Sequence, residues 1–145
     1  MSNFSYEIGS DNIAIIKWDV PDKKFNVLTL EGISEIENIL EKIFENNNLK
    51  GVIISSNKDD FSAGMDLKVL AHLQDQSKNK EEIFQFVMRA HQFLRKIELG
   101  GIDPKTKKGG IPFVWACSGL SAGIATEIGL ACHYRIATDK KNTKT

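Results

Sequence analysis

Two short segments of the sequence place small residues directly before a turn: SAGMD at residues 62–66 and SAGIATE at residues 121–127. Small side chains let a ligand or another chain segment approach the backbone, whose N–H groups then become available as donors. Two such N–H groups aimed at one oxygen form an oxyanion hole, which stabilises negative charge developing on a carbonyl. The signal is weak on its own, because Ser-Ala-Gly is common in loops.

Glu127 is the only charged side chain between Gly109 and Cys132. It lies about one turn into a predicted helix that begins near Ser121. In apolar surroundings, desolvation would favour the neutral carboxyl group, which could then exchange a proton near neutral pH. The alternative is a glutamate on the solvated stripe of an amphipathic helix, and composition does not decide between the two.

The other residues with reactive side chains predict structural roles. We expect His72 and His91 on the surface, and His133 in a structural hydrogen bond. Cys117 and Cys132 fit no metal-ligand spacing and are expected to be buried free thiols. We therefore predict no metal site. No GxSxG, GxGxxG or GxxxxGK[ST] motif is present, so neither a serine nucleophile nor nucleotide binding is indicated.

Composition excludes several classes of protein. Acidic and basic residues number 19 each in a chain of 145 residues, so there is no electrostatic reason to expect binding to nucleic acid or to an anionic membrane. The N-terminus lacks the basic and apolar regions of a secretory signal, which predicts a cytoplasmic protein. Residues 111–132 are apolar enough to suggest a membrane span, but Glu127 would be costly in lipid. We predict two buried elements there and no membrane span.

The hydrophobic pattern predicts strands alternating with helices, which is typical of an α/β fold with a parallel sheet. The expected strands are residues 4–8 and 12–18, paired across a turn, then 51–56, 111–117 and 132–137. The expected helices are residues 33–43 with Thr29 as N-cap, residues 81–98 and residues 121–131. One face of the second helix is expected to carry Ile83, Val87, Ala90, Leu94 and Ile97. The apolar run 51–56 predicts a strand covered on both faces, and residues 57–80 are expected to be a loop.

The motifs together resemble those of the crotonase (enoyl-CoA hydratase/isomerase) superfamily. FSAGMDLKVL at residues 61–70 resembles its F-(S/A)-A-G-x-D-(I/L)-K segment, and residues 111–138 resemble its second signature. The loop VPDKKFNVLT at residues 20–29 resembles its P-x-x-x-N-x-L region. The likeness runs through nearly the whole chain in the same order. It implies the α/β crotonase (ClpP/crotonase-like) fold, a spiral of repeated ββα units.

The resemblance also implies a site. The backbone N–H groups of Met65 and Ile124 would form an oxyanion hole for the thioester carbonyl of an acyl-CoA, the second aided by a helix dipole. Glu127 matches the first catalytic glutamate; in hydration, one glutamate and its partner activate water for attack at C3 and deliver a proton at C2. The further residues expected to contact substrate or coenzyme A are Ala63, Gly64, Asp66, Leu67, Lys68 and Gly123. Coenzyme A is part of the substrate, so hydration needs no cofactor.

This chain departs from the family pattern in two places, and both departures change what we expect of its site and its activity. Where the family has three glycines, this chain has Gly123-Ile124-Ala125, whose side chains must find room near the acyl group. The second family glutamate follows in a G-L-P-E-like segment, and the chain ends at Thr145 before it. We therefore expect residues 1–145 to be the N-terminal part of an enoyl-CoA hydratase/isomerase domain, with the spiral incomplete at the C-terminus. Such a fragment would be inactive alone and would expose an apolar edge.

The leading hypothesis is the hydratase region of a fatty-acid β-oxidation enzyme that acts in a homo-oligomer or a β-oxidation complex. Residues 11–29 and 130–139 are most similar to the multifunctional fatty-acid oxidation α-subunit, in which a 3-hydroxyacyl-CoA dehydrogenase region follows; NAD would be needed only there. Two alternatives stay open: an enoyl-CoA isomerase and a non-catalytic acyl-CoA-binding module. A serine peptidase on the related spiral is disfavoured, because no serine-histidine-aspartate set is evident.

Overall fold

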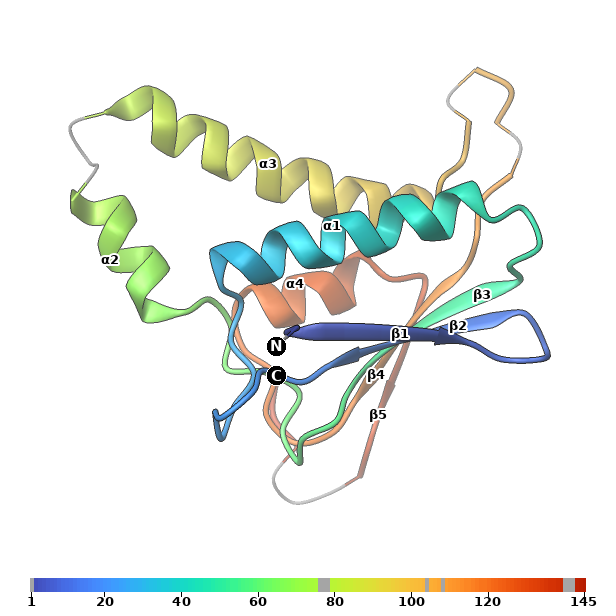
Figure 1. The fold of residues 1–145 in the computed structure, drawn as a ribbon, viewed down its shortest axis with the longest axis horizontal. Coiled ribbons are helices and arrows are strands. Elements are labelled where there is room, and N and C mark those ends of the chain that lie inside the picture. Colours follow the sequence, from blue (N-terminus) through green and yellow to red (C-terminus); the bar gives the residue numbers. More distant parts are fainter. Residues whose placement is uncertain (1, 76–78, 104, 108, 140–142) are drawn as a thin grey trace.

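The computed structural model describes residues 2–75, 79–103, 105–107, 109–139 and 143–145. Strands and helices alternate through most of the chain, as the sequence predicts. In order they are β1 (Phe4–Ile8), β2 (Ile13–Trp18), α1 (Leu30–Glu45), β3 (Gly51–Ser56), α2 (Leu67–Asp75), α3 (Lys80–Leu99), β4 (Phe113–Cys117), α4 (Ile124–Ala131) and β5 (Tyr134–Ala137). Figure 1 shows α1, α3 and α4 stacked on one side of the strands, with α2 and the start of α3 extending past them.

The strands form one sheet in the order β1-β2-β3-β4-β5. β1 pairs with β2 as an antiparallel hairpin, whereas β2, β3, β4 and β5 are parallel neighbours. Parallel neighbours need long crossovers, and the helices supply them. The predicted hairpin and the predicted parallel sheet are both confirmed.

The core lies between the helices and one face of the sheet. Alternate strand residues point toward the helices because successive side chains of a strand face opposite sides. From the sheet the buried apolar residues are Phe4, Ala14, Ile16, Trp18, Val52, Ile54, Phe113, Trp115 and Cys117. Helix α1 covers them with Ile36, Leu40 and Ile43, which recur at helical spacing.

The opposite face of the sheet is only partly covered. Ile15, Ile53 and Val114 lie side by side in register there and are half-buried. The expectation that residues 51–56 would be covered on both faces is therefore wrong for the part of the chain that the structure describes. The reason is that α1, α3 and α4 all lie on the same side of the sheet (Figure 1).

The helix ends follow from local chemistry. The Thr29 hydroxyl oxygen accepts a hydrogen bond from the N–H of Gly32, which confirms the predicted N-cap of α1. α3 begins with Asn79 as its cap and ends at Gly100, whose φ of 56° is left-handed. Glycine adopts that angle without the penalty of a β-carbon.

One local prediction is wrong. Residues 67–75, expected to be part of a loop, form α2, which buries only Val69. This helix extends past the sheet in Figure 1, where there is little to bury against. On the apolar face predicted for the second helix, Ile97 is buried and Val87 is 42% exposed.

Within the described residues, no helix combines the length and the apolar character that crossing a membrane requires. The apolar run 111–132 instead divides into the buried strand β4 and the helix α4.

Candidate active site

The two Ser-Ala-Gly segments lie side by side in the structure. Ser62 and Ser121 are paired in a parallel β-bridge. The N–H of Ala122 donates to the carbonyl oxygen of Ser62 at 3.1 Å, and the N–H of Ser62 donates to that of Leu120 at 3.1 Å. Both serines are buried. The small residues noted in the sequence therefore serve first to let two backbones pair.

The first segment turns so that the N–H of Met65 has no partner within the described part of the chain. A second parallel bridge joins Leu28 to Met65: the N–H of Leu28 donates to the carbonyl oxygen of Gly64 at 2.8 Å, and the N–H of Asp66 donates to that of Leu28 at 3.0 Å. The N–H of Gly64 donates to the Ser62 hydroxyl. Among the described residues, no acceptor bonds the N–H of Met65.

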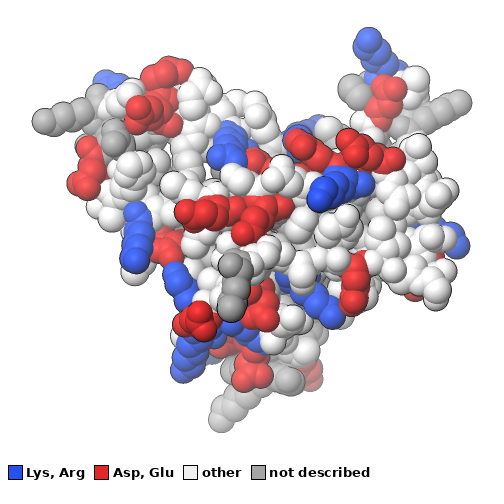
Figure 2. All heavy atoms as spheres, in the orientation of Figure 1, with Lys and Arg blue, Asp and Glu red and all other residues white. Residues whose placement is uncertain are grey.

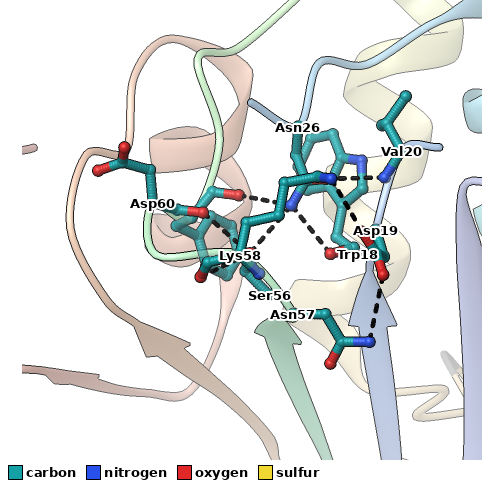
Figure 3. A network of polar contacts seen from close by, with 9 residues as sticks. Trp18, Asp19, Val20, Asn26, Ser56, Asn57, Lys58 and Asp60 are labelled. Atoms are coloured by element: carbon teal, nitrogen blue, oxygen red, sulfur yellow. Dashed lines mark hydrogen bonds and ion pairs between the residues drawn. The ribbon is translucent and has the colours of Figure 1, made fainter. Parts of the chain in front are cut away.

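A buried asparagine holds this segment in place (Figure 3). Asn26 Oδ1 accepts the N–H of Val20 at 2.9 Å, while Nδ2 donates to Trp18 O, Ser56 Oγ and Phe61 O. Its own carbonyl oxygen accepts the N–H of Ala63 and the hydroxyl of Ser62. A fully buried amide with all these partners is a rigid anchor, because breaking any of them leaves a buried polar group unpaired.

The second segment leads into the N-terminus of α4. Gly123 caps this helix with φ 53° and ψ −129°, and its carbonyl oxygen accepts the N–H groups of Thr126 and Glu127. The N–H of Ile124 has no acceptor among the described residues, as is usual in the first turn of a helix. Asp60 restrains the residues just before this segment, because its Oδ1 accepts the N–H of Leu120 at 2.7 Å.

The two segments thus present, from adjacent backbones, N–H groups that no described residue accepts. Gly64 lies so close to the second segment that a β-carbon on it would be 2.8 Å from the carbonyl oxygen of Ala122. A β-carbon on Gly123, by contrast, would meet no atom within 4 Å. Two donors beside an open space are what an oxyanion hole requires.

Ile124 and Ala125 do find room. Both side chains are buried in the core rather than in the space before Gly123. Ile124 lies with Met65 on the wall of a small apolar pocket that is bounded by α1 and α3. Ile124 and Ala125 are thus accommodated in the hydrophobic core of the described residues.

Glu127 lies in the first turn of α4, one turn from Ile124, and is exposed. Its carboxylate has no hydrogen bond or ion pair within the described ranges. Of the two possibilities left open by the sequence, the solvated position is the one observed here. The apolar surroundings that would activate the carboxyl group are not supplied by this part of the chain.

The residues expected to contact coenzyme A divide into two groups. Ala63, Leu67 and Lys68 are exposed, and Lys68 borders an open hollow together with His72. Asp66 is buried at the start of α2, where Oδ1 accepts the N–H of Lys68 at 2.8 Å.

Lys23 is a residue that the sequence analysis missed. Its Nζ lies 2.6 Å from Asp66 Oδ2, and this hydrogen bond lowers the pKa of Asp66 below its ordinary value. The carboxylate of Asp66 is thus occupied within the protein, so it shapes the edge of the hollow rather than offering a free charge. Asn26 was also given no role, although it lies in the loop whose likeness to the family was noted; a buried polar residue is not visible from sequence alone.

The predictions for the histidines and the cysteines are confirmed. His72 and His91 are exposed. His133 Nδ1 accepts the N–H of Phe113 at 3.0 Å. Cys117 and Cys132 are buried free thiols, and burial raises their pKa values to about 11 and about 12. Across the described ranges, no three His, Cys, Asp or Glu residues are grouped closely enough to hold a metal.

The chain matches the sequence model of a known protein family and resembles solved structures. The model of the enoyl-CoA hydratase/isomerase family matches residues 9–143. Among solved structures, an enoyl-CoA hydratase from Bacillus anthracis is 27% identical, with a TM-score of 0.72 over 94% of this chain. An enoyl-CoA hydratase from Thermoplasma volcanium, 20% identical, superimposes with a TM-score of 0.75 over 94% of this chain, which shows the shared fold. The chain spans about half the length of these structures, 47% and 48%.

Proposed function

Because the chain belongs to the enoyl-CoA hydratase/isomerase family and has its α/β crotonase fold, we propose that it carries the oxyanion hole and first catalytic glutamate of an enoyl-CoA hydratase. The observation that supports this most strongly is the pairing of the two Ser-Ala-Gly segments. It leaves the N–H groups of Met65 and Ile124 without an acceptor among the described residues, beside open space at Gly123.

In this proposal the thioester carbonyl oxygen of an enoyl-CoA accepts hydrogen bonds from Met65 and Ile124. The donors are backbone groups held by paired segments, so they need no reorganisation as negative charge grows on the oxygen. The N-terminus of α4 adds its dipole to the second donor. Polarisation of the thioester makes C3 electrophilic, and water adds there while the enolate-like intermediate takes a proton at C2.

Glu127 is proposed to act in this proton transfer, together with a second acid as in the family pattern. It lies at the same helix end as Ile124 and is free of partners among the described residues. A carboxylate in water is a weak base at neutral pH, so the proposal requires that bound substrate covers it. An acyl-CoA lying over Gly123 would exclude water from this helix end and strengthen each interaction there.

The test is hydration of crotonyl-CoA, followed through the loss of absorbance of the conjugated thioester. It should be run on this chain and on any longer product that its gene encodes. Glu127→Gln should lower the rate by about 100-fold or more, because it removes the acid/base group, and should leave binding of crotonyl-CoA intact. Glu82→Gln is the matched control, because Glu82 lies in the first turn of α3; it should have no effect. An unchanged rate in Glu127→Gln would contradict the proposed role.

Two other functions each have an observation in their favour. A single free carboxylate beside the hole suits an enoyl-CoA isomerase, which moves one proton and would convert 3-hexenoyl-CoA to its 2-enoyl isomer. The exposure of Glu127 suits a non-catalytic acyl-CoA-binding module. Binding of crotonyl-CoA without turnover in every form of the protein would favour the module.

The wider setting is also a proposal. The likeness of residues 11–29 and 130–139 to the multifunctional α-subunit supports a role in fatty-acid β-oxidation. In that case NAD would serve a separate 3-hydroxyacyl-CoA dehydrogenase region, and the protein would act in a homo-oligomer or a β-oxidation complex.

A further inference from the structure

Two hydroxyl groups are bonded to each other across the turn that leads into α4. Ser121 Oγ lies 3.2 Å from Thr126 Oγ1, and Thr126 Oγ1 donates to the carbonyl oxygen of Ser121 at 3.0 Å. A hydroxyl has a single hydrogen, so Ser121 is the donor in the bond between the two hydroxyls. We call these two residues the hydroxyl pair. The stretch between them contains Ile124, whose N–H is one of the two proposed oxyanion donors.

The direction of the Ile124 N–H depends on the peptide unit that it shares with Gly123. The carbonyl of Gly123 and the N–H of Ile124 lie in one plane and point in opposite directions, because the peptide bond is planar and trans. The Gly123 carbonyl oxygen accepts the N–H groups of Thr126 at 2.9 Å and of Glu127 at 3.1 Å. The position of Thr126 therefore helps to set the direction of the donor.

The hydroxyl pair takes the place of a helix cap at this turn. Gly123 caps α4 without a side-chain hydrogen bond, at φ 53° and ψ −129°. A cap side chain would otherwise restrain the first turn, and glycine has more conformational freedom than any other residue. Burial of Ile124 and Ala125 holds the helix against the core, but it acts on side chains rather than on the peptide before Ile124. The hydroxyl pair restrains that peptide through Thr126.

The other end of the hydroxyl pair is tied to the first Ser-Ala-Gly segment. Ser121 is 1% exposed and forms a parallel bridge with Ser62, three residues before Met65. On its other side, the N–H of Ser121 donates to the carbonyl oxygen of Lys144 at 2.8 Å. The hydroxyl pair thus links the second donor to the backbone that carries the first.

We propose that Ser121 and Thr126 are positioning residues, which hold the Ile124 N–H at the angle needed to share one oxygen with the Met65 N–H. This inference rests on the proposed function, because the angle matters only if a thioester oxygen binds between the two donors. A hydrogen bond weakens steeply as its angle departs from linearity, and bonds to a charged acceptor are the stronger ones. Loss of the hydroxyl pair should therefore weaken binding of a negatively charged oxygen more than binding of a neutral carbonyl.

The experiment compares two acyl-CoA ligands that differ in that charge. Butyryl-CoA offers a neutral thioester carbonyl. Acetoacetyl-CoA has an acidic C–H between two carbonyls and can bind as its enolate, which places negative charge on the thioester oxygen. Calorimetry gives both affinities, and the ultraviolet absorbance of the enolate reports how much of the bound acetoacetyl-CoA is ionised. The wild-type chain should bind acetoacetyl-CoA more tightly than butyryl-CoA, and as the enolate.

Removal of the hydroxyls should lower affinity for the enolate in steps. Thr126→Val keeps the branched shape but removes both bonds of the hydroxyl pair. It should lower affinity for acetoacetyl-CoA about tenfold and that for butyryl-CoA less than about twofold. Ser121→Ala leaves the bond from Thr126 to the backbone carbonyl and should cost about threefold for acetoacetyl-CoA alone. Thr126→Ser keeps the hydroxyl and should bind both ligands as the wild type does.

The matched control is Thr138→Val. Thr138 Oγ1 lies 2.9 Å from the hydroxyl of Thr143, five residues further along the chain as in the hydroxyl pair. Neither proposed donor lies between these two residues, so Thr138→Val should change neither affinity.

The inference is overturned, while the proposed function stands, if Thr126→Val weakens both ligands equally or weakens neither, or if Thr126→Ser shows the same loss. If circular dichroism shows that Thr126→Val does not fold, Ser121→Ala decides by the same comparison. If the folded wild-type chain binds neither ligand, or binds acetoacetyl-CoA only in its neutral form, the proposed oxyanion hole fails and the inference falls with it.

Discussion

In the first Ser-Ala-Gly segment the glycine is surrounded by backbone, whereas in the second it faces open space. A β-carbon on Gly64 would be 2.8 Å from the carbonyl oxygen of Ala122, and one on Gly123 would meet nothing within 4 Å. The same three letters thus meet two different requirements. Gly64 allows two chain segments to pair, and Gly123 combines a positive φ with room for a ligand.

The carboxylates that follow the two glycines differ in the same way. Asp66 is buried and paired with Lys23, whereas Glu127 is exposed and unpaired among the described residues. The first segment is therefore the rigid half of the site and the second is the half that meets substrate. The packing around Gly64 and Asp66, and the lack of packing around Gly123 and Glu127, thus give similar motif residues different roles.

The largest effect is expected at the anchor of the rigid half. Asn26→Ala removes the side-chain partners of Val20, Trp18 and Phe61 and should lower the free energy of unfolding by about 4 kcal/mol, because buried polar groups lose their bonds. Asp60→Ala, which removes one partner from the second segment, should cost about 1–2 kcal/mol. Urea unfolding measures both.

Asn57→Ala is the control for these variants, because Asn57 is exposed and its single long bond to Asp19 is 3.5 Å. It should change stability by less than about 0.5 kcal/mol. If Asn26→Ala and Asp60→Ala lowered the free energy of unfolding equally, the distinction between a rigid and an open half of the site would be contradicted.

The next largest effects are expected from alanine substitutions of the two glycines, Gly64 and Gly123. Gly64→Ala brings a clash with Ala122 in addition to a φ of 93°, so it should lower the free energy of unfolding by about 3 kcal/mol. Gly123→Ala carries strain at φ 53° but no clash and should cost about 1–2 kcal/mol. Its larger effect should be on crotonyl-CoA binding, since the methyl group enters the open space. A Gly123→Ala variant that binds as the wild type does would show that the substrate lies elsewhere.

The smallest changes in stability are expected at the carboxylates of Asp66 and Glu127. The hydrogen bond from Lys23 lowers the folded-state pKa of Asp66 below its ordinary 3.8. Its stabilisation is therefore present above that pH and is lost as pH falls through the folded-state pKa. Lys23→Met should lower the free energy of unfolding by about 1 kcal/mol or less at neutral pH, because Lys23 is 43% exposed and screened.

The pH dependence gives the check. The difference in free energy of unfolding between Lys23→Met and the wild type should shrink as pH falls below 3.8. Glu127→Gln, which breaks no bond among the described residues, should change stability by less than about 0.5 kcal/mol at neutral pH. A difference for Lys23→Met that persists unchanged into strong acid would contradict the proposed ion pair.

Much of the fold could be predicted from the sequence, because strong local patterns specify it. The β-branched runs, the Thr29 cap and the apolar spacing in residues 33–43 all gave the observed elements. Helix α2 was missed because it buries only Val69 and so lacks an apolar stripe. The exposure of Val87 could not be predicted, because apolar spacing shows which residues share a face, not how far the neighbouring sheet extends.

The site could be predicted in part. The resemblance named Met65, Ile124 and Glu127, and the structure shows that the two segments carrying them are paired. That pairing is a contact between residues far apart in the chain, and no local pattern specifies it. The exposure of Glu127 follows from which face of α4 packs on the core: Ile124, Ala125, Ile128 and Gly129 are buried. In an almost uniformly apolar segment, periodicity does not reveal that face.

The central claim is that the N–H groups of Met65 and Ile124 bind the thioester carbonyl, and backbone amide NMR tests it most directly. In a titration of the ¹⁵N-labelled chain with crotonyl-CoA, the amide protons of these two residues should move downfield as new hydrogen bonds form. Those of Ala63 and Ala125, which already donate to Asn26 O and Ala122 O, should move little. Binding of crotonyl-CoA that leaves Met65 and Ile124 unmoved, or no binding at saturating concentration, would contradict the account.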